Sequence, residues 1–187
     1  MGHPTTERGR DVRHRLLAAA TDLIPELGWE AVSTRLVAEQ AGVTPGLVHY
    51  HFASLTALLR EAALTAMRQL GATTEDVFAD DPDPATGLSR LLGMLDAYAG
   101  DDPVSLLFVE TYLASTRELE LQRELRELVA ELIAPIARWL AANDVPEPEA
   151  TAAVITAAVD GLMLHRALNP SLTAATVEPV LARLVAR

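Results

Sequence analysis

Residues 44–51, Thr-Pro-Gly-Leu-Val-His-Tyr-His, bring together side chains that can hydrogen-bond to a nucleic acid. His49 and His51 can donate to phosphate oxygens, and the Tyr50 hydroxyl can do the same. The histidines are two positions apart, so on a helix they point to opposite sides and cannot bind one metal ion together. The chemistry that this segment favours is contact with a polyanion.

Two short helices are needed to present these side chains. Ser33 or Thr34 can cap the first helix, and Gly42 can adopt the left-handed conformation that ends it. Thr44 can cap a second helix whose first position is Pro45, where the absent N–H group does no harm. Helix, tight turn and short helix form the helix-turn-helix pattern, whose second helix lies in the major groove of DNA.

The second helix is expected to have an inner and an outer face. Leu47 is predicted to point inward and Phe52 to lie in the core. The residues predicted to point mostly outward are Pro45, Gly46, Val48, His49 and His51. The Tyr50 ring is expected to pack while its hydroxyl reaches a phosphate.

Residues in and around this pattern resemble the N-terminal domain of the tetracycline-repressor (TetR) family of bacterial transcription regulators. The matching segments are Asp11 to Leu27 with Gly28-Trp29, Leu36-Val37-Ala38, Ala41-Gly42-Val43-Thr44, Gly46-Leu47, Tyr50-His51-Phe52 and Leu58-Leu59, with Asp160-Gly161-Leu162 later in the chain. Two positions depart from the family pattern. Leu55 stands where a phosphate-contacting lysine is usual, and His49 stands where a tyrosine is usual.

The resemblance implies an all-α fold of about nine helices. It implies a helix-turn-helix DNA-binding domain at residues 1–54 and a ligand-binding and dimerisation domain at residues 55–187. It also implies a homodimer that binds a palindromic double-stranded DNA operator and releases it when a small-molecule effector binds. In that scheme the effector tilts the helix that follows Ser54 and changes the separation of the two recognition helices.

Apolar periodicity and helix-breaking residues predict where the helices lie. The ranges are 11–27, the two short helices described above, a long helix from Ser54 or Thr56 to about 70, then 85–99, 104–116, 119–142, 149–168 and a last helix within 173–185. The range 119–142 is the most regular, because leucine or isoleucine recurs on one stripe from Leu121 to Leu140.

Eight residues are predicted to contact DNA. They are Arg35, Thr44, Pro45, Gly46, Leu47, His49, Tyr50 and His51. Arg35 lies at the start of the first short helix, from which it can contact a phosphate. Arg8, Arg10 and Arg13 either form a basic arm on DNA or a solvated tail, and the sequence leaves both readings open.

Charge is unevenly distributed along the chain. The formal net charge is −11, but residues 1–60 hold six arginines and six acidic residues, so the excess lies beyond residue 60. Only the N-terminal part is therefore suited to approach DNA. The chain has no cysteine, no apolar run long enough to span a bilayer and no apolar segment at its start. We expect a cytoplasmic protein without disulfides and without membrane contact.

The C-terminal part is expected to hold a dimer interface and an effector pocket. The predicted helix at 149–168 has no charge between Glu149 and Asp160, so it either crosses the core or is covered by a second subunit. We expect the homodimer contact within residues 149–187. The candidate pocket residues are Met94, Tyr98, Phe108, Tyr112, Trp139 and Met163. Such a lining suits a mostly apolar effector with one or two hydrogen-bonding groups.

No catalytic or metal-binding pattern accompanies these features. The sequence has no Gly-x-Ser-x-Gly, no phosphate-binding glycine loop and no His–carboxylate cluster at ligand spacing. We predict no enzyme activity, no metal site and no cofactor. Two alternatives stay open: a helical small-molecule carrier or enzyme that keeps the helix-turn-helix only as structure, and an interaction module that offers its apolar helix to a different protein.

Overall fold

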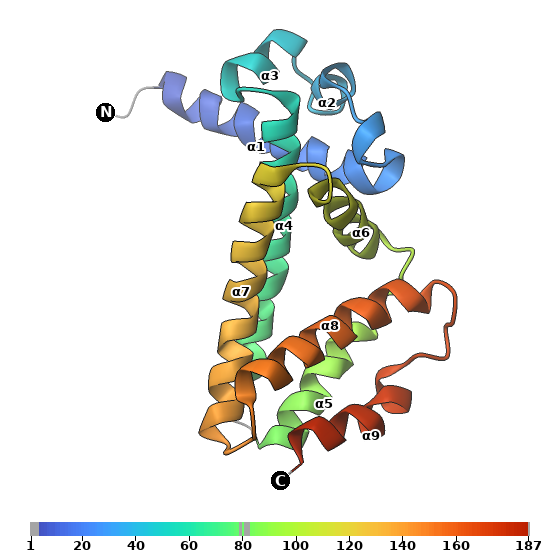
Figure 1. Cartoon of the computed structure of the whole chain (residues 1–187). Coiled ribbons are helices and arrows are strands. Elements are labelled where there is room, and N and C mark those ends of the chain that lie inside the picture. Colours follow the sequence, from blue (N-terminus) through green and yellow to red (C-terminus); the bar gives the residue numbers. More distant parts are fainter. Residues whose placement is uncertain (1–3, 79, 81–82, 187) are drawn as a thin grey trace. The chain divides into compact units, whose positions relative to one another are not determined.

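The computed structural model describes residues 4–78, 80 and 83–186, and over these residues the chain is all-helical, as the sequence predicts (Figure 1). The α-helices are α1 (Pro4–Leu27), α2 (Thr34–Gln40), α3 (Pro45–His51), α4 (Leu55–Glu75), α5 (Pro84–Leu95), α6 (Pro103–Ser115), α7 (Leu119–Ala142), α8 (Pro148–Arg166) and α9 (Ala174–Val185). Two 3₁₀ turns are η1 (Trp29–Ala31) and η2 (Asp76–Phe78). Within the described ranges, no helix has both the length and the apolar character that a membrane span requires.

The helices form two compact units. The first unit contains the chain up to Met67 together with Leu106–Gln122, and the second contains Arg68–Ser105 and the chain from Arg123 onward. The division passes through α4, α6 and α7, so each of these helices contributes residues to both units.

Local signals set where the helices begin and end. Five of them, α1, α3, α5, α6 and α8, begin at a proline, whose fixed φ suits the first helical position. Ser33 caps α2, as predicted, because its hydroxyl accepts the Leu36 N–H at 3.3 Å. Gly42 follows α2 with φ of 65°, which confirms the left-handed conformation expected there.

The core of the first unit holds the helix-turn-helix in place. Leu16 and Ile24 of α1, Val37 of α2, Val48 of α3 and Leu58 of α4 are completely buried. Removing one such aliphatic side chain from water contributes about 1.5–3 kcal/mol. The position of α3 is therefore fixed by its own buried residue and by the helices beneath it.

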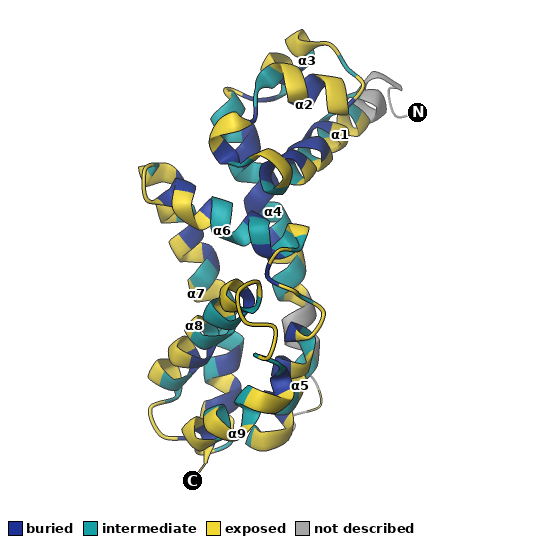
Figure 2. Ribbon diagram, turned by 90° about the vertical axis from the view of Figure 1, so that its right-hand side faces the viewer, coloured by how far each residue is buried: buried dark blue, intermediate teal, exposed yellow. Residues whose placement is uncertain are grey.

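The second unit has a separate core made by α5, α7, α8 and α9. Leu88, Trp139 and Ile155 are among its buried members. The Phe78 ring lies against the Trp139 ring, with 4.6 Å between the ring centroids. A Cβ at Gly87 would overlap the Trp139 indole, so glycine is what lets α5 approach the ring this closely. Figure 2 shows the buried residues of each unit in dark blue.

Asp102 fixes the loop before α6. Its carboxylate accepts the Ser105 hydroxyl at 2.6 Å and the Ser105 N–H at 3.0 Å, and also the N–H groups of Ala99, Gly100 and Val104. Burial alone would raise the pKa of Asp102, but these hydrogen bonds outweigh it and hold that pKa below its ordinary value. The start of α6 is thus capped by an ionised side chain in the second unit.

Candidate nucleic-acid interface

The turn between α2 and α3 is closed by hydrogen bonds from both sides. Val43 N–H donates to the Ala38 carbonyl at 2.9 Å, which ends α2. The Arg15 guanidinium of α1 donates to the Ala41 carbonyl, also at 2.9 Å. Thr44 is the N-cap of α3, although its side chain makes no capping hydrogen bond. The helix-turn-helix geometry predicted from the sequence is therefore present.

The inner face of α3 differs from the sequence prediction. Val48, expected to point outward, is completely buried, whereas Leu47, expected to point inward, is only half-buried. The reason is that Val48 lies four residues before Phe52, and side chains at that spacing share one helix face. Phe52 is buried, as predicted, and it brings Val48 into the core with it.

The predicted DNA contacts mostly lie on the outside of the first unit. Arg35, Thr44, Pro45, Gly46, His49 and Tyr50 are exposed. Figure 2 shows the exposed outer surface of α3 in yellow. Tyr50 is 80% exposed, so its ring does not pack as expected. The backbone at Gly46 is open to a partner, because a Cβ there would meet nothing within 4 Å.

Two predicted contacts are less accessible. Leu47 and His51 are half-buried. The His51 ring meets the Tyr50 ring edge-on at 5.0 Å between centroids, and its Cε1 lies near Gly9 of α1. His51 therefore faces α1 more than it faces solvent, which favours a positioning role for it.

Most arginines of the first unit are engaged by other residues. Arg13 donates to Glu61 at 2.6 Å and lies over the Phe52 ring, 4.8 Å from its centroid. Arg13 thus links α1 to α4 through a partly exposed ion pair, which favours a structural role for it. The Arg8 side chain, also proposed for that arm, lies outside the described residues. Arg35 is exposed, and no ion pair or hydrogen bond of its side chain is found within the described part of the chain.

Glu110 of α6 supports the first unit through a contact that the sequence did not reveal. Gly28, with φ of 84°, precedes η1 and has no side chain with which to cap it. The Glu110 carboxylate accepts the Trp29 N–H at 2.8 Å and so caps this turn from 81 positions away. A charge-assisted hydrogen bond of this kind is worth about 1.5–3 kcal/mol. No local pattern around Gly28 points to residue 110.

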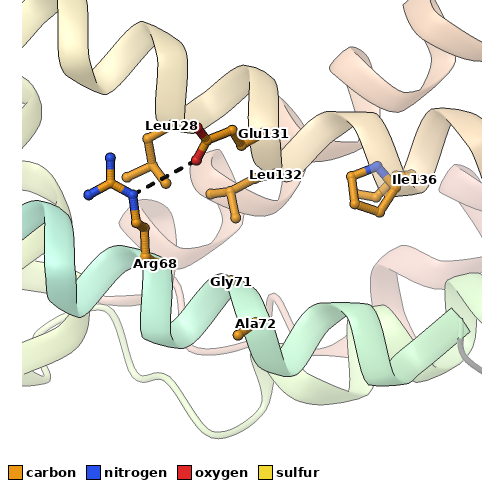
Figure 3. Close-up of a pocket in the computed structure, with 8 residues that line it drawn as sticks. Arg68, Gly71, Ala72, Leu128, Glu131, Leu132 and Ile136 are labelled. Atoms are coloured by element: carbon orange, nitrogen blue, oxygen red, sulfur yellow. Dashed lines mark ion pairs between the residues drawn. The ribbon is translucent and has the colours of Figure 1, made fainter.

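The second unit contains a small pocket between α4 and α7 (Figure 3). Its volume is about 160 Å³. Leucine, isoleucine, alanine and proline side chains form most of its wall, and the lining residues are Arg68, Gly71, Ala72, Leu128, Glu131, Leu132, Pro135 and Ile136. Arg68 Nε and Glu131 Oε2 lie 3.8 Å apart in an exposed ion pair at this pocket. The wall is therefore apolar with one charged pair.

The six residues predicted to line an effector pocket are placed elsewhere. Trp139 and Met163 are buried in the core of the second unit, and Tyr98 packs against that core. Met94 is half-buried on α5. Phe108, which is half-buried, and Tyr112, which is exposed, lie on the part of α6 that belongs to the first unit. The residues that line the α4–α7 pocket include none of the six.

An apolar surface covers one side of α8 and α9 in the second unit. A hollow of about 450 Å³ there is lined by Ala158, Gly161, Leu162, His165, Leu172, Thr176, Val177, Val180 and Leu181. Val154 and Leu164 extend the exposed apolar side of α8, and the exposed Leu168 follows just beyond its end. Positions 154, 158, 161 and 165 share one face of α8, and all of them except His165 are apolar or glycine.

Comparisons with known proteins agree with this architecture. Residues 16–62 match the family of bacterial regulatory proteins, tetR family, and residues 82–187 match the tetracyclin repressor-like C-terminal domain. Because the second match alone covers more than half of the chain, the chain belongs to the tetracycline-repressor family. It is a ligand-responsive, DNA-binding regulator of transcription.

Relatives resemble the chain over most of its length. The HTH-type transcriptional regulator BetI of Burkholderia ambifaria is 30% identical over 85% of this chain and 84% of that protein. A transcriptional regulator of Rhodococcus sp. Rha1 has a similar structure, with a TM-score of 0.77, 28% identity and coverage of 92% and 93%. The transcriptional regulator FadR of Bacillus subtilis, solved in complex with stearoyl-CoA, shares the fold at a TM-score of 0.74 and 16% identity, covering 92% and 96%.

Proposed function

We propose that the protein is a repressor that binds a palindromic operator as a homodimer and releases it when a small effector binds. The observation that carries this proposal is the outer face of α3. There Gly46, His49 and Tyr50 are exposed directly after a closed helix-turn-helix turn. Such a face can enter a major groove, where its first residues meet base edges. Arg35, on the neighbouring helix α2, supplies a cation that can contact a DNA phosphate.

The functional division of the chain is proposed at residues 54 and 55. Residues 1–54 contain the helix-turn-helix, and residues 55–187 contain the effector and dimer sites. Helix α4 begins at Leu55 and contributes residues to both compact units. A helix shared in this way can carry a change from the effector site to the DNA-binding domain, provided that the effector prefers one of two arrangements.

The effector is proposed to be a mostly apolar molecule with one or two hydrogen-bonding groups. The α4–α7 pocket supports this class, because its wall is apolar apart from Arg68 and Glu131. Its volume of about 160 Å³ is smaller than the 300–1,000 Å³ typical of ligand sites. Binding of a larger molecule must therefore move α4 and α7 apart. That movement would be the switch.

The homodimer is proposed to form through the apolar surface of α8 and α9. Leu168 is 84% exposed and Val180 is 59% exposed. Contiguous exposed apolar surface of this kind marks an interaction site in a folded protein. A two-fold contact through one patch is also the commonest form of protein symmetry. It would place two recognition helices on one operator, in the cytoplasm where the chromosome lies.

A gel-shift experiment tests this function. The full chain should shift the DNA upstream of its own gene at nanomolar to micromolar concentration, and excess unrelated DNA should not abolish the shift. His49→Ala with Tyr50→Ala should abolish it, while the matched pair His14→Ala with Tyr112→Ala, both exposed on other helices of the first unit, should not. Absence of a specific shift by the wild type would favour the carrier or enzyme alternative.

A further inference from the structure

The DNA-facing side of α2 and α3 has little fixed positive charge. Among residues 33–55, Arg35 and Glu39 are the ionised side chains, and both are exposed. Their charges cancel. Elsewhere in the first unit Arg15 is paired with Asp11 at 3.2 Å, and Arg10 and Arg60 have partners of their own. A polyanion that approaches this face therefore meets few available cations.

His49 is the group on this face whose charge can change. It is exposed on α3, and its side chain makes no hydrogen bond or ion pair within the described residues. The charged residues on the helix packed against α3 are Arg35 and Glu39 of α2. His51, in contrast, faces Gly9 of α1, whose nearby charged residues Arg10 and Arg13 are already engaged.

We propose that His49 contacts an operator phosphate in its protonated form, so that operator affinity rises as the pH falls from about 8 to about 6. This inference rests on the proposed DNA-binding function. Neutral imidazole has one N–H donor, whereas imidazolium has two and carries a positive charge. A phosphate beside the ring favours the charged form, so each subunit takes up a proton when it binds DNA. The proton supplies the cation that α3 otherwise lacks.

Linkage sets the size of the effect. The slope of log affinity against pH equals the number of protons taken up, which is at most about two for a dimer. The affinity can therefore rise by at most about 100-fold for each unit by which the pH falls. Each additional phosphate contact steepens the slope of log affinity against log salt concentration by about 0.9, which is about 1.8 for a dimer with one such contact per subunit.

The test measures binding of a fluorescent operator, selected from random DNA, by anisotropy at about pH 6, 7 and 8 and at two salt concentrations. The variants are His49→Gln, which cannot charge, and His49→Arg, which is always charged. His14→Gln is the matched control, because His14 is an exposed histidine on α1 of the same unit. Sedimentation at each pH establishes that the assembly state is constant.

We expect the wild type and the His14→Gln control to bind more tightly at low pH, with a steeper salt dependence. His49→Gln should bind at all pH values as the wild type does at the highest pH, and His49→Arg should bind tightly throughout. A His49→Gln profile identical to the wild type would overturn the inference. If the wild type selects no DNA sequence from the random pool at any of these pH values, the proposed function itself is contradicted.

Discussion

The outer face of α3 and the outer face of α8 and α9 are both exposed, but their chemistry is opposite. On α3 the exposed residues are proline, glycine, histidine and tyrosine. On α8 and α9 they are mainly valine, leucine and alanine, with His165 as a polar member of the surface. A polar face stays hydrated until a partner offers equivalent hydrogen bonds. An apolar face gains free energy simply by losing water.

This difference assigns the two faces to different partners. The face on α3 suits a hydrated polyanion that is read by hydrogen bonds and held by charge. The face on α8 and α9 suits another protein surface, and an identical copy is the simplest one. Repressor activity on a palindrome requires both faces, because two copies of α3 must be held at a fixed separation.

The largest expected effect comes from Gly161→Arg in the apolar surface. A Cβ at Gly161 meets nothing within 4 Å, so the subunit should fold normally while the arginine blocks a partner. We expect monomers by sedimentation and operator binding weakened by at least about 100-fold, since a buried unpaired charge costs several kcal/mol. Gly93→Arg is the matched control, because a Cβ there also meets nothing within 4 Å. If the Gly161→Arg protein is still a dimer, this surface is not the dimer interface.

A smaller effect should separate the inner face of α3 from its outer face. Val48→Ala should lower the free energy of unfolding by about 2 kcal/mol, because it leaves a cavity in the first unit. Leu47→Ala, at a half-buried position, should cost less than half of that. Chemical denaturation measures both values. Equal losses, or a larger one for Leu47→Ala, would contradict the register of α3 described above.

Asp102 predicts how the second unit responds to acid. Its pKa is depressed in the folded protein, so its contribution to stability is complete well above the unfolded value near 3.9 and is lost as the pH falls through the folded pKa. Asp102→Ala should therefore cost about 1–2 kcal/mol at neutral pH and almost nothing near pH 2. The exposed neighbour Asp101 provides the control variant, Asp101→Ala. Thermal unfolding of both variants at several pH values measures the difference, and a pH-independent loss would show that Asp102 acts without its charge.

The smallest expected effect is a gain. Leu55→Lys should place a cation at the start of α4, where the family usually has one. We expect operator affinity to rise a few-fold and the log–log salt slope to steepen by about 1.8 for a dimer, with no change in preferred sequence. Leu119→Lys is the control, because Leu119 is an exposed leucine of the same unit. If both variants tighten binding equally, the gain comes from net charge and Leu55 does not face the DNA backbone.

Local signals in the sequence predicted most of the fold. The leucine stripe predicted α7 at residues 119–142, and the structure has it at Leu119–Ala142. Capping at Ser33 and the left-handed Gly42 were also predictable, because each depends on neighbours within a few positions. The helix predicted at 85–99 instead ends at Leu95. Arg166 of α8 donates to the Leu95 carbonyl at this end, and such a distant partner leaves no periodic trace in the sequence.

The candidate site was also predictable where it depends on neighbouring residues, and not where it depends on distant ones. The residue types on α3 and their order indicated DNA contact, and six of the eight predicted residues are exposed. The assignment of Leu47 and Val48 was reversed because both are apolar, and only the i to i+4 relation with Phe52 distinguishes them. Glu110 could not be found, because its partner is a backbone N–H on a distant segment.

Selection of bound sequences from random double-stranded DNA tests the central claim most directly. The wild type should enrich a two-fold symmetric sequence whose half-sites lie about one helical turn, or a multiple of it, apart. Gly161→Arg should enrich no such palindrome, while Gly93→Arg should enrich the same one as the wild type. A wild type that enriches no sequence, or only an asymmetric one, would contradict the account of a dimer that reads DNA through two copies of α3.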